Sequence, residues 1–146
     1  MKNSKLFSDD KLDLFIPEGI EYIHDVLNSI GFTNYTSKDA RVKGLETIKK
    51  LLNLKLIEIF SWGKYNNEFK DEEFSTDEII MHLRTVWFEG ADFSDFISMP
   101  MFKYKDWYVQ AQENAGLTHT TNWKWFVKSK IGDLEQWIEE HRPKDE

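Results

Sequence analysis

The sequence predicts an α+β fold, a mostly helical single domain (residues 1–146) with a small sheet. Much of the chain carries apolar residues at helical spacing, and several of these stretches begin at a capping residue or end at a glycine. Lys55–Trp62 alternates instead with a period of two and is rich in β-branched and aromatic residues, as expected of a strand. The 146 residues show no repeat and no linker rich in Gly, Pro or Ser, which favours one domain.

The first element is a predicted helix over residues 17–30. Pro17 suits the first turn, where a missing N–H costs nothing, and Gly31 follows the last apolar position. The chain before Pro17 shows no clear period. Leu12, Leu14 and Ile16 alternate with other residues there, so we expect a short strand or a docked arm.

A second helix is predicted over residues 37–53. Thr36-Ser37 offers an oxygen to its first free amides. Gly44 lies in the middle of this helix, where glycine is unfavourable, and therefore predicts a close packing contact. The polar face carries four cations, which suit either a solvated face or a nucleic-acid contact: Arg41, Lys43, Lys49 and Lys50.

A polar loop over residues 64–74 separates the predicted strand from a third helix, 76–88. The helix begins at Ser75-Thr76-Asp77-Glu78, a capping box in which Glu78 reaches back to the cap amide. Apolar residues at helical spacing follow the box and fix the period.

Three further elements are predicted beyond the turn region 90–100. A short helix of about 104–115 ends at Gly116 and Leu117. Residues 123–128 alternate as a strand would, although Trp123, Phe126 and Val127 also fit a helix. Asp133 caps a final helix, and an acidic end follows.

Charge and composition exclude several functions. The chain has 19 Lys+Arg against 26 Asp+Glu, a net charge of −7, which argues against nucleic-acid binding. With no cysteine it has no disulfide, thiolate metal site or cysteine nucleophile. No signal peptide or membrane span is recognisable, so we expect a cytoplasmic protein without a membrane partner.

No catalytic motif is present, and we expect no catalytic residue, metal or cofactor. The glycines are isolated, and no serine lies in a nucleophile elbow. The four histidines stand far apart in sequence. If the chain has a pocket, the polar cluster Thr118–Asn122 beside aromatic residues is where we expect it.

The stretch Lys64–Glu78 is the candidate binding surface. It holds six carboxylates against two lysines, with aromatic residues between them, a pattern that a solvated loop or a surface for a cationic protein would show. The candidate partner-binding residues are Trp62, Tyr65, Phe69, Asp71, Glu72, Glu73, Asp77 and Glu78. A second acidic run, Glu139, Glu140, Asp145 and Glu146, would add to the negative potential.

Two resemblances follow from these residues. GLETIKKLLNLKLIEIFSWG followed by STDEIIMHLRTVW resembles small bacterial proteins with a winged-helix-like core, over roughly residues 17–88. In size, acidity and lack of catalytic motifs, the chain also resembles the immunity proteins of contact-dependent growth inhibition. That resemblance implies a cognate toxin domain as partner, often a cationic nuclease, whose active site the protein covers. A winged-helix DNA-binding regulator and a small enzyme of unrecognised type are the alternatives.

Overall fold

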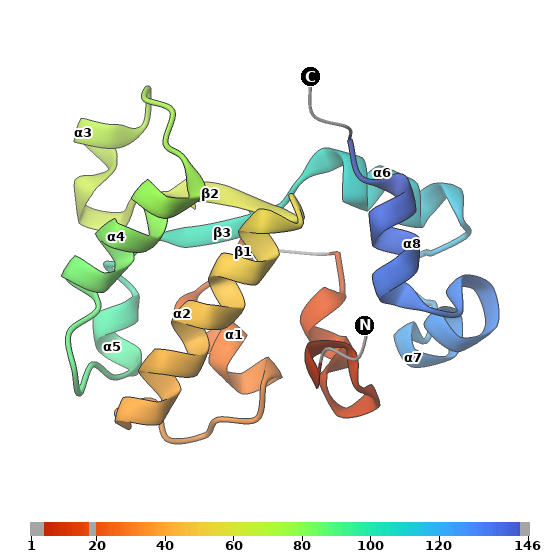
Figure 1. Ribbon diagram of the computed structural model, residues 1–146, viewed down its shortest axis with the longest axis horizontal. Helices are drawn as coiled ribbons and strands as arrows, with labels where there is room; N and C mark the ends of the chain where they lie inside the picture. Colours follow the sequence, from red (N-terminus) through yellow and green to blue (C-terminus); the bar gives the residue numbers. More distant parts are fainter. Residues whose placement is uncertain (1–4, 18–19, 144–146) are drawn as a thin grey trace.

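A computed structural model describes residues 5–17 and 20–143 (Figure 1). It confirms the predicted class, mostly helical α+β with a small sheet. The α-helices are α1 (Ile23–Ser29), α2 (Lys38–Asn53), α3 (Asn66–Phe69), α4 (Thr76–Val86), α5 (Phe93–Phe96), α6 (Asp106–Asn114), α7 (Trp123–Phe126) and α8 (Leu134–His141). The 3₁₀-helices are η1 (Lys5–Phe7), η2 (Asp9–Phe15) and η3 (Gly63–Tyr65), and η4 (Val127–Ile131) is a π-helical turn.

The sheet is antiparallel, with strand order β1-β3-β2. Its strands are β1 (Ile20–Glu21), β2 (Ile57–Ser61) and β3 (Met101–Tyr104). The predicted strand is β2, whereas β3, the central strand, lies between the predicted turn region 90–100 and the predicted helix of about 104–115 and was not predicted. The predicted order helix, helix, strand is present as α1, α2 and β2. The winged-helix-like core remains a prediction, because three α-helices, rather than a short turn, connect β2 to β3.

Figure 1 shows α1, α2, α4 and α5 around the sheet at one end of the molecule and α6, α7 and α8 at the other, with η2 between the two groups. Buried apolar side chains from both ends form one hydrophobic cluster, which extends from Leu12 to Ile138. The core is therefore continuous along the molecule.

The segment η2 is the docked arm that the sequence allowed, and the strand alternative is wrong. Three aromatic side chains hold its backbone carbonyls. Trp123 Nε1 donates to Leu12 O over 2.7 Å, Tyr108 Oη donates to Phe15 O over 2.6 Å, and Tyr104 Oη donates to Leu14 O. Burial raises the pKa of Tyr108, so its hydroxyl keeps the proton that it donates.

The prediction that one helix covers residues 17–30 is wrong at its start. Residues 18–19 lie outside the described part of the chain, and Ile20 and Glu21 pair with β3 as a strand. The helix begins at Ile23, where the Asp25 carboxylate accepts the Tyr22 amide over 2.9 Å. The helix ends as predicted. The Phe32 amide donates to Leu27 O, a hydrogen bond that spans Gly31 and closes the last helical turn.

Helix α2 begins as predicted, with the Ala40 amide donating to Ser37 Oγ over 3.0 Å. The predicted packing contact at Gly44 is confirmed. A Cβ there would lie 2.5 Å from Trp87 Cη2 and 2.9 Å from Leu27 Cδ2, so a glycine lets α1, α2 and the end of α4 meet closely.

Helix α4 has the predicted capping box. The Glu78 amide donates to Ser75 Oγ over 3.1 Å, and the Ser75 amide donates to Glu78 Oε1 over 2.8 Å. The preceding residues 64–74 are only in part the predicted loop, because η3 and α3 take up residues 63–69.

The strand predicted over residues 123–128 is wrong, and the helical alternative holds. Trp123, Phe126 and Val127 are buried while Trp125 is 54% exposed. A strand would have placed Trp123, Trp125 and Val127 on one face. The Asn122 side chain caps α7 by accepting the Trp125 amide over 2.9 Å.

The remaining predicted helices are present as α6 and α8. The Leu117 amide donates to Gln112 O over 3.1 Å and closes α6 as expected. Asp133 Oδ1 accepts the Gln136 amide over 3.1 Å and caps α8.

Candidate partner-binding surface

An aromatic cluster lies beneath the predicted binding surface. We define it as Trp62, Tyr65, Phe69, Phe74 and His82. The Trp62 ring meets the rings of Phe69 and Phe74 edge to face, with centroids 5.3 and 5.0 Å apart, and the His82 ring lies 5.2 Å from that of Trp62. The five rings come from the end of β2, from η3, from α3, from the α3–α4 connection and from α4. Their contacts therefore hold residues 63–74 against α4.

The predicted aromatic residues therefore support the surface more than they form it. Trp62 is 5% exposed, so a partner cannot reach its ring in this conformation. Tyr65 and Phe69 are half-buried and stack on each other with centroids 5.8 Å apart. Sequence alone did not separate these two roles, because burial depends on the fold of the connection.

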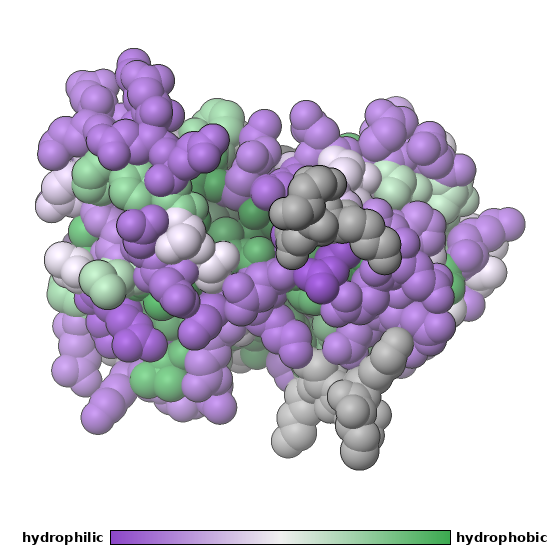
Figure 2. Space-filling model, turned by 45° about the horizontal axis from the view of Figure 1, so that its top comes forward, coloured by the Kyte–Doolittle hydropathy of each residue, from purple (hydrophilic) through white to green (hydrophobic). Residues whose placement is uncertain are grey.

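The carboxylates lie on the outside of the cluster. We call Asp71, Glu72, Glu73, Asp77 and Glu78 the acidic corner; all five are exposed. Figure 2 shows hydrophilic side chains gathered over the corner of the molecule where α3 and the connection to α4 lie in Figure 1. The structure thus brings the predicted carboxylates together on one projecting segment and the adjoining first turn of α4.

Two members of the acidic corner have structural partners. Lys49 Nζ lies 4.0 Å from Asp77 Oδ1, and Glu78 completes the capping box of α4. For Asp71, Glu72 and Glu73, no salt bridge or side-chain hydrogen bond is formed within the part of the chain that the structure describes. Three consecutive carboxylates thus remain available to an external cation.

A groove of about 430 Å³ runs beside the acidic corner. Its floor includes the apolar residues Leu52, Ile57 and Trp62. The charged residues that line it are Glu58, Lys70, Glu72, Glu73 and Lys105. Lys103 Nζ lies 3.6 Å from Glu58 Oε2 and partly neutralises it.

The sequence did not identify Glu58, Lys70 and Lys105 as residues of the candidate binding surface. The alternation within β2 marked Glu58 as a polar position on the strand, which was the available signal. No such signal existed for Lys105, because its place at the groove follows from the pairing of β2 with β3.

The second acidic run is less available. Arg142 Nε lies 3.0 Å from Glu139 Oε1, and Gln136 Nε2 donates to Glu140 Oε2 over 3.1 Å. Asp145 and Glu146 lie outside the described residues. In Figure 1, α8 lies at the opposite end of the molecule from α3, so this run and the acidic corner are separate surfaces.

The cationic face of α2 is largely occupied by internal contacts. Arg41 Nε donates to Trp87 O over 2.6 Å, and its Nη2 donates to Arg84 O over 3.0 Å. Lys43 Nζ lies 4.0 Å from Glu46 Oε1, and Lys49 faces Asp77. Among the described residues, these contacts leave Lys50 as the member of that set with neither an ion pair nor a side-chain hydrogen bond.

Residues suited to chemistry are dispersed. Within residues 5–17 and 20–143, no group of three or more His, Asp or Glu side chains could hold a metal ion. His24 lies against the rings of Tyr22 and Phe93 at centroid distances of 5.3 and 4.4 Å. A pocket lies beside Thr118, His119 and Thr121, within the polar cluster Thr118–Asn122 where the sequence predicted one.

No protein-family profile, curated protein or solved structure matches this chain. Among the helices of the described residues, none has both the length and the apolar character needed to cross a membrane.

Proposed function

We propose that this chain is a non-catalytic binding protein whose acidic corner captures a cationic protein domain. Its role would be that of an immunity protein of the contact-dependent growth inhibition type, acting in the cytoplasm on a cognate toxin domain. The single observation that carries the proposal is the exposed run Asp71-Glu72-Glu73, which is held on a well-packed support and to which no cation of the described residues is paired.

Electrostatic steering explains how such a run would act. Complementary charge raises association rates by about 10- to 1000-fold over those of neutral surfaces, and salt screens the effect. The net charge of −7 adds to the local field of the run. The active-site cleft of a cationic nuclease binds phosphates, and these carboxylates would occupy the position of the phosphates.

The aromatic cluster supports this proposal through pre-organisation. A segment that is already ordered loses less conformational entropy when it binds. Phe69 and Phe74 anchor the two ends of the acidic run, with centroids 5.3 Å apart. The carboxylates between them are thus displayed on a short, tethered connection.

The DNA-binding alternative has less support. Phosphate binding needs several free cations on one face. On α2, Arg41 is bound to the carbonyls at the end of α4, and Lys49 faces Asp77. Helix α4 presents Asp77 and Glu78 in its first turn, which would repel phosphate.

The test is partner capture with a charge-reversal variant. Wild-type protein and the triple variant Asp71→Lys, Glu72→Lys, Glu73→Lys are used as baits in a lysate of the host cell. The matched control reverses three exposed carboxylates outside both acidic runs that cap no helix, Asp13, Glu46 and Glu89, and changes the net charge equally. A partner retained by wild type and control but lost by the corner variant is the expected result.

Kinetics and toxicity then separate the two parts of the proposal. In stopped-flow mixing at low salt, the corner variant should associate at least about tenfold more slowly and lose its salt dependence. An unchanged rate would show that the acidic corner is not the interface. If the captured domain is harmless when it is expressed without this chain, the immunity role fails while the binding role stands.

A further inference from the structure

We infer that the pocket between α6, the end of the N-terminal arm and the segment Leu117–Trp123 binds a small primary amine with an aromatic or branched hydrocarbon body. This pocket has a volume of about 670 Å³. That volume lies within the roughly 300–1,000 Å³ typical of small-molecule sites. It lies on the α6–α8 side of the molecule, away from the acidic corner, so the inference is independent of the proposed function.

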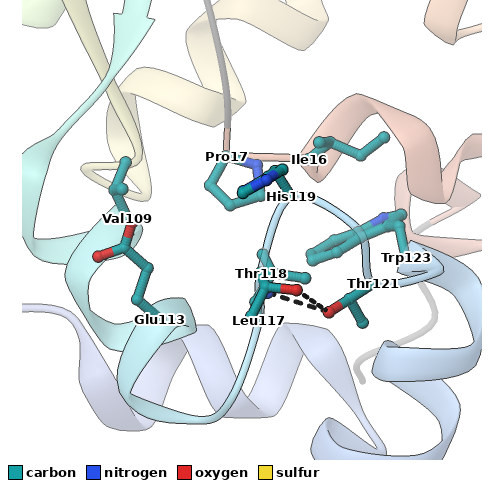
Figure 3. A pocket seen from close by; sticks show the side chains of 9 residues that line it. All are labelled: Ile16, Pro17, Val109, Glu113, Leu117, Thr118, His119, Thr121 and Trp123. Carbon is teal, nitrogen blue, oxygen red and sulfur yellow. Dashed lines mark hydrogen bonds between the residues drawn. The ribbon is translucent and has the colours of Figure 1, made fainter.

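The walls of the pocket are mostly apolar. Figure 3 shows Ile16, Pro17 and His119 on one side of the hollow, Val109 and Glu113 on a second, and Trp123 on a third. Leu117, Thr118 and Thr121 complete the lining. A ligand would therefore bury a hydrocarbon body against aliphatic and indole surfaces.

The pocket is pre-formed by contacts that do not involve a ligand. The Thr118 amide donates to Thr121 Oγ1 over 3.0 Å, and the two hydroxyl oxygens lie 2.8 Å apart. The indole N–H of Trp123 is held by Leu12 O, and Asn122 caps α7 immediately before it. Binding thus requires no ordering of the 117–123 segment.

The charge of the lining selects the ligand's polar group. Among the described residues that line the pocket, Glu113 is the one carboxylate, His119 supplies an imidazole, and none is a lysine or an arginine. Within the described part of the chain, the Glu113 carboxylate has no salt bridge and no side-chain hydrogen bond. The hydroxyls of Thr118 and Thr121 hydrogen-bond to each other, whereas the Glu113 carboxylate brings a full negative charge, so it is the group in the lining best suited to a ligand's ammonium.

The test compares three probes that share an indole body: tryptamine, the neutral 2-(indol-3-yl)ethanol and indole-3-propionate. Binding to the full chain is followed by ¹⁵N–¹H NMR, using the amides of Thr118 and Thr121 and the indole N–H of Trp123. We expect saturable shifts there, with tryptamine bound most tightly and the carboxylate most weakly. Shifts that map elsewhere, or that do not saturate, would overturn the inference.

Two variants identify the source of any affinity. Glu113→Gln should weaken tryptamine about threefold to fivefold, the effect of losing a solvent-exposed ion pair, and leave the neutral alcohol unchanged. Glu89→Gln, the same change at an exposed position outside the pocket lining, should alter neither. Equal effects of the two variants on tryptamine would show that Glu113 does not bind the ammonium.

Val109→Phe fills the pocket from the α6 wall and should abolish binding of all three probes. Because Val109 is half-buried, the thermal midpoint of this variant is measured first. A folded variant that still binds tryptamine with wild-type affinity would place the ligand outside this pocket.

Discussion

Gly44 of α2 and Trp87, at the end of α4, are in contact so close that no side chain fits between them. A Cβ on Gly44 would lie 2.5 Å from Trp87 Cη2, and the Trp87 ring is 1% exposed, packed edge to face on Phe96 with centroids 5.5 Å apart. The ring therefore has no free space into which to retreat.

Replacing Gly44 with alanine should destabilise the protein despite the better helix propensity of alanine. Propensity favours alanine by about 1 kcal/mol, but overpacking a core costs about 1–3 kcal/mol and here has two opposing side chains to displace. Urea unfolding measures the net effect, with exposed Glu46→Ala on the same helix as control. A rise in the free energy of unfolding for Gly44→Ala would contradict the packing described.

Gly63 joins β2 to the segment beneath the acidic corner and is expected to be more sensitive still. Its φ is +66°, and a Cβ would lie 2.1 Å from the backbone oxygen of Ser98. Gly31, with φ +100° and nothing within 4 Å, offers a matched control that isolates the conformational cost, about 1–2 kcal/mol. Gly63→Ala should cost clearly more than Gly31→Ala in urea unfolding; equal costs would mean that the approach to Ser98 is not tight.

Arg41 binds the end of α4 through two hydrogen bonds, to Trp87 O and Arg84 O. These carbonyls belong to the last turn and the C-cap, where they lack intrahelical partners and carry negative partial charge. Arg41→Met should cost about 1–3 kcal/mol in the free energy of unfolding, because it removes charge-assisted hydrogen bonds. Arg41→Lys should recover only part of this, since an ammonium lacks the planar fork. Full recovery by lysine would show that charge alone suffices.

His82 should make the stability depend on pH. Burial in the aromatic cluster lowers the pKa of His82 from its ordinary value of 6.5, and its Nε2 has no hydrogen-bond partner among the residues that the structure describes. As pH falls through 6.5, the unfolded chain takes up this proton before the folded one does, so the contribution of His82 is complete above 6.5 and is lost below it.

His82→Phe keeps a ring in the aromatic cluster but removes the titrating group. Thermal midpoints measured from pH 8 to pH 5 should therefore fall more steeply for the wild type than for the variant below about pH 6.5. Since both proteins share the other histidines, the difference between the two curves reports His82. Parallel curves would show that the cluster does not disfavour the charged imidazole.

The starts of α2, α4 and α8 were predictable because their first amides are satisfied locally. Ser75 with Glu78, Ser37 and Asp133 each bind amides within three residues, so the pattern in the sequence is the whole interaction. The exposure of Asp71, Glu72 and Glu73 was also predictable locally, because three consecutive carboxylates in a polar stretch favour solvent.

The strands and the inner side of the candidate surface were decided by tertiary structure. β1 is a strand because it pairs with β3, some 80 residues away, and β3 pairs on its other side with β2; neither β1 nor β3 has a local signal of its own. Trp123 turns toward the arm because Leu12 O accepts its indole N–H, which selects a helix from a stretch that fits either period. Trp62 is buried because Phe69, Phe74 and His82 close around it only in the folded chain. Hydrogen bonds within a turn are encoded locally, whereas burial and strand pairing depend on residues distant in sequence.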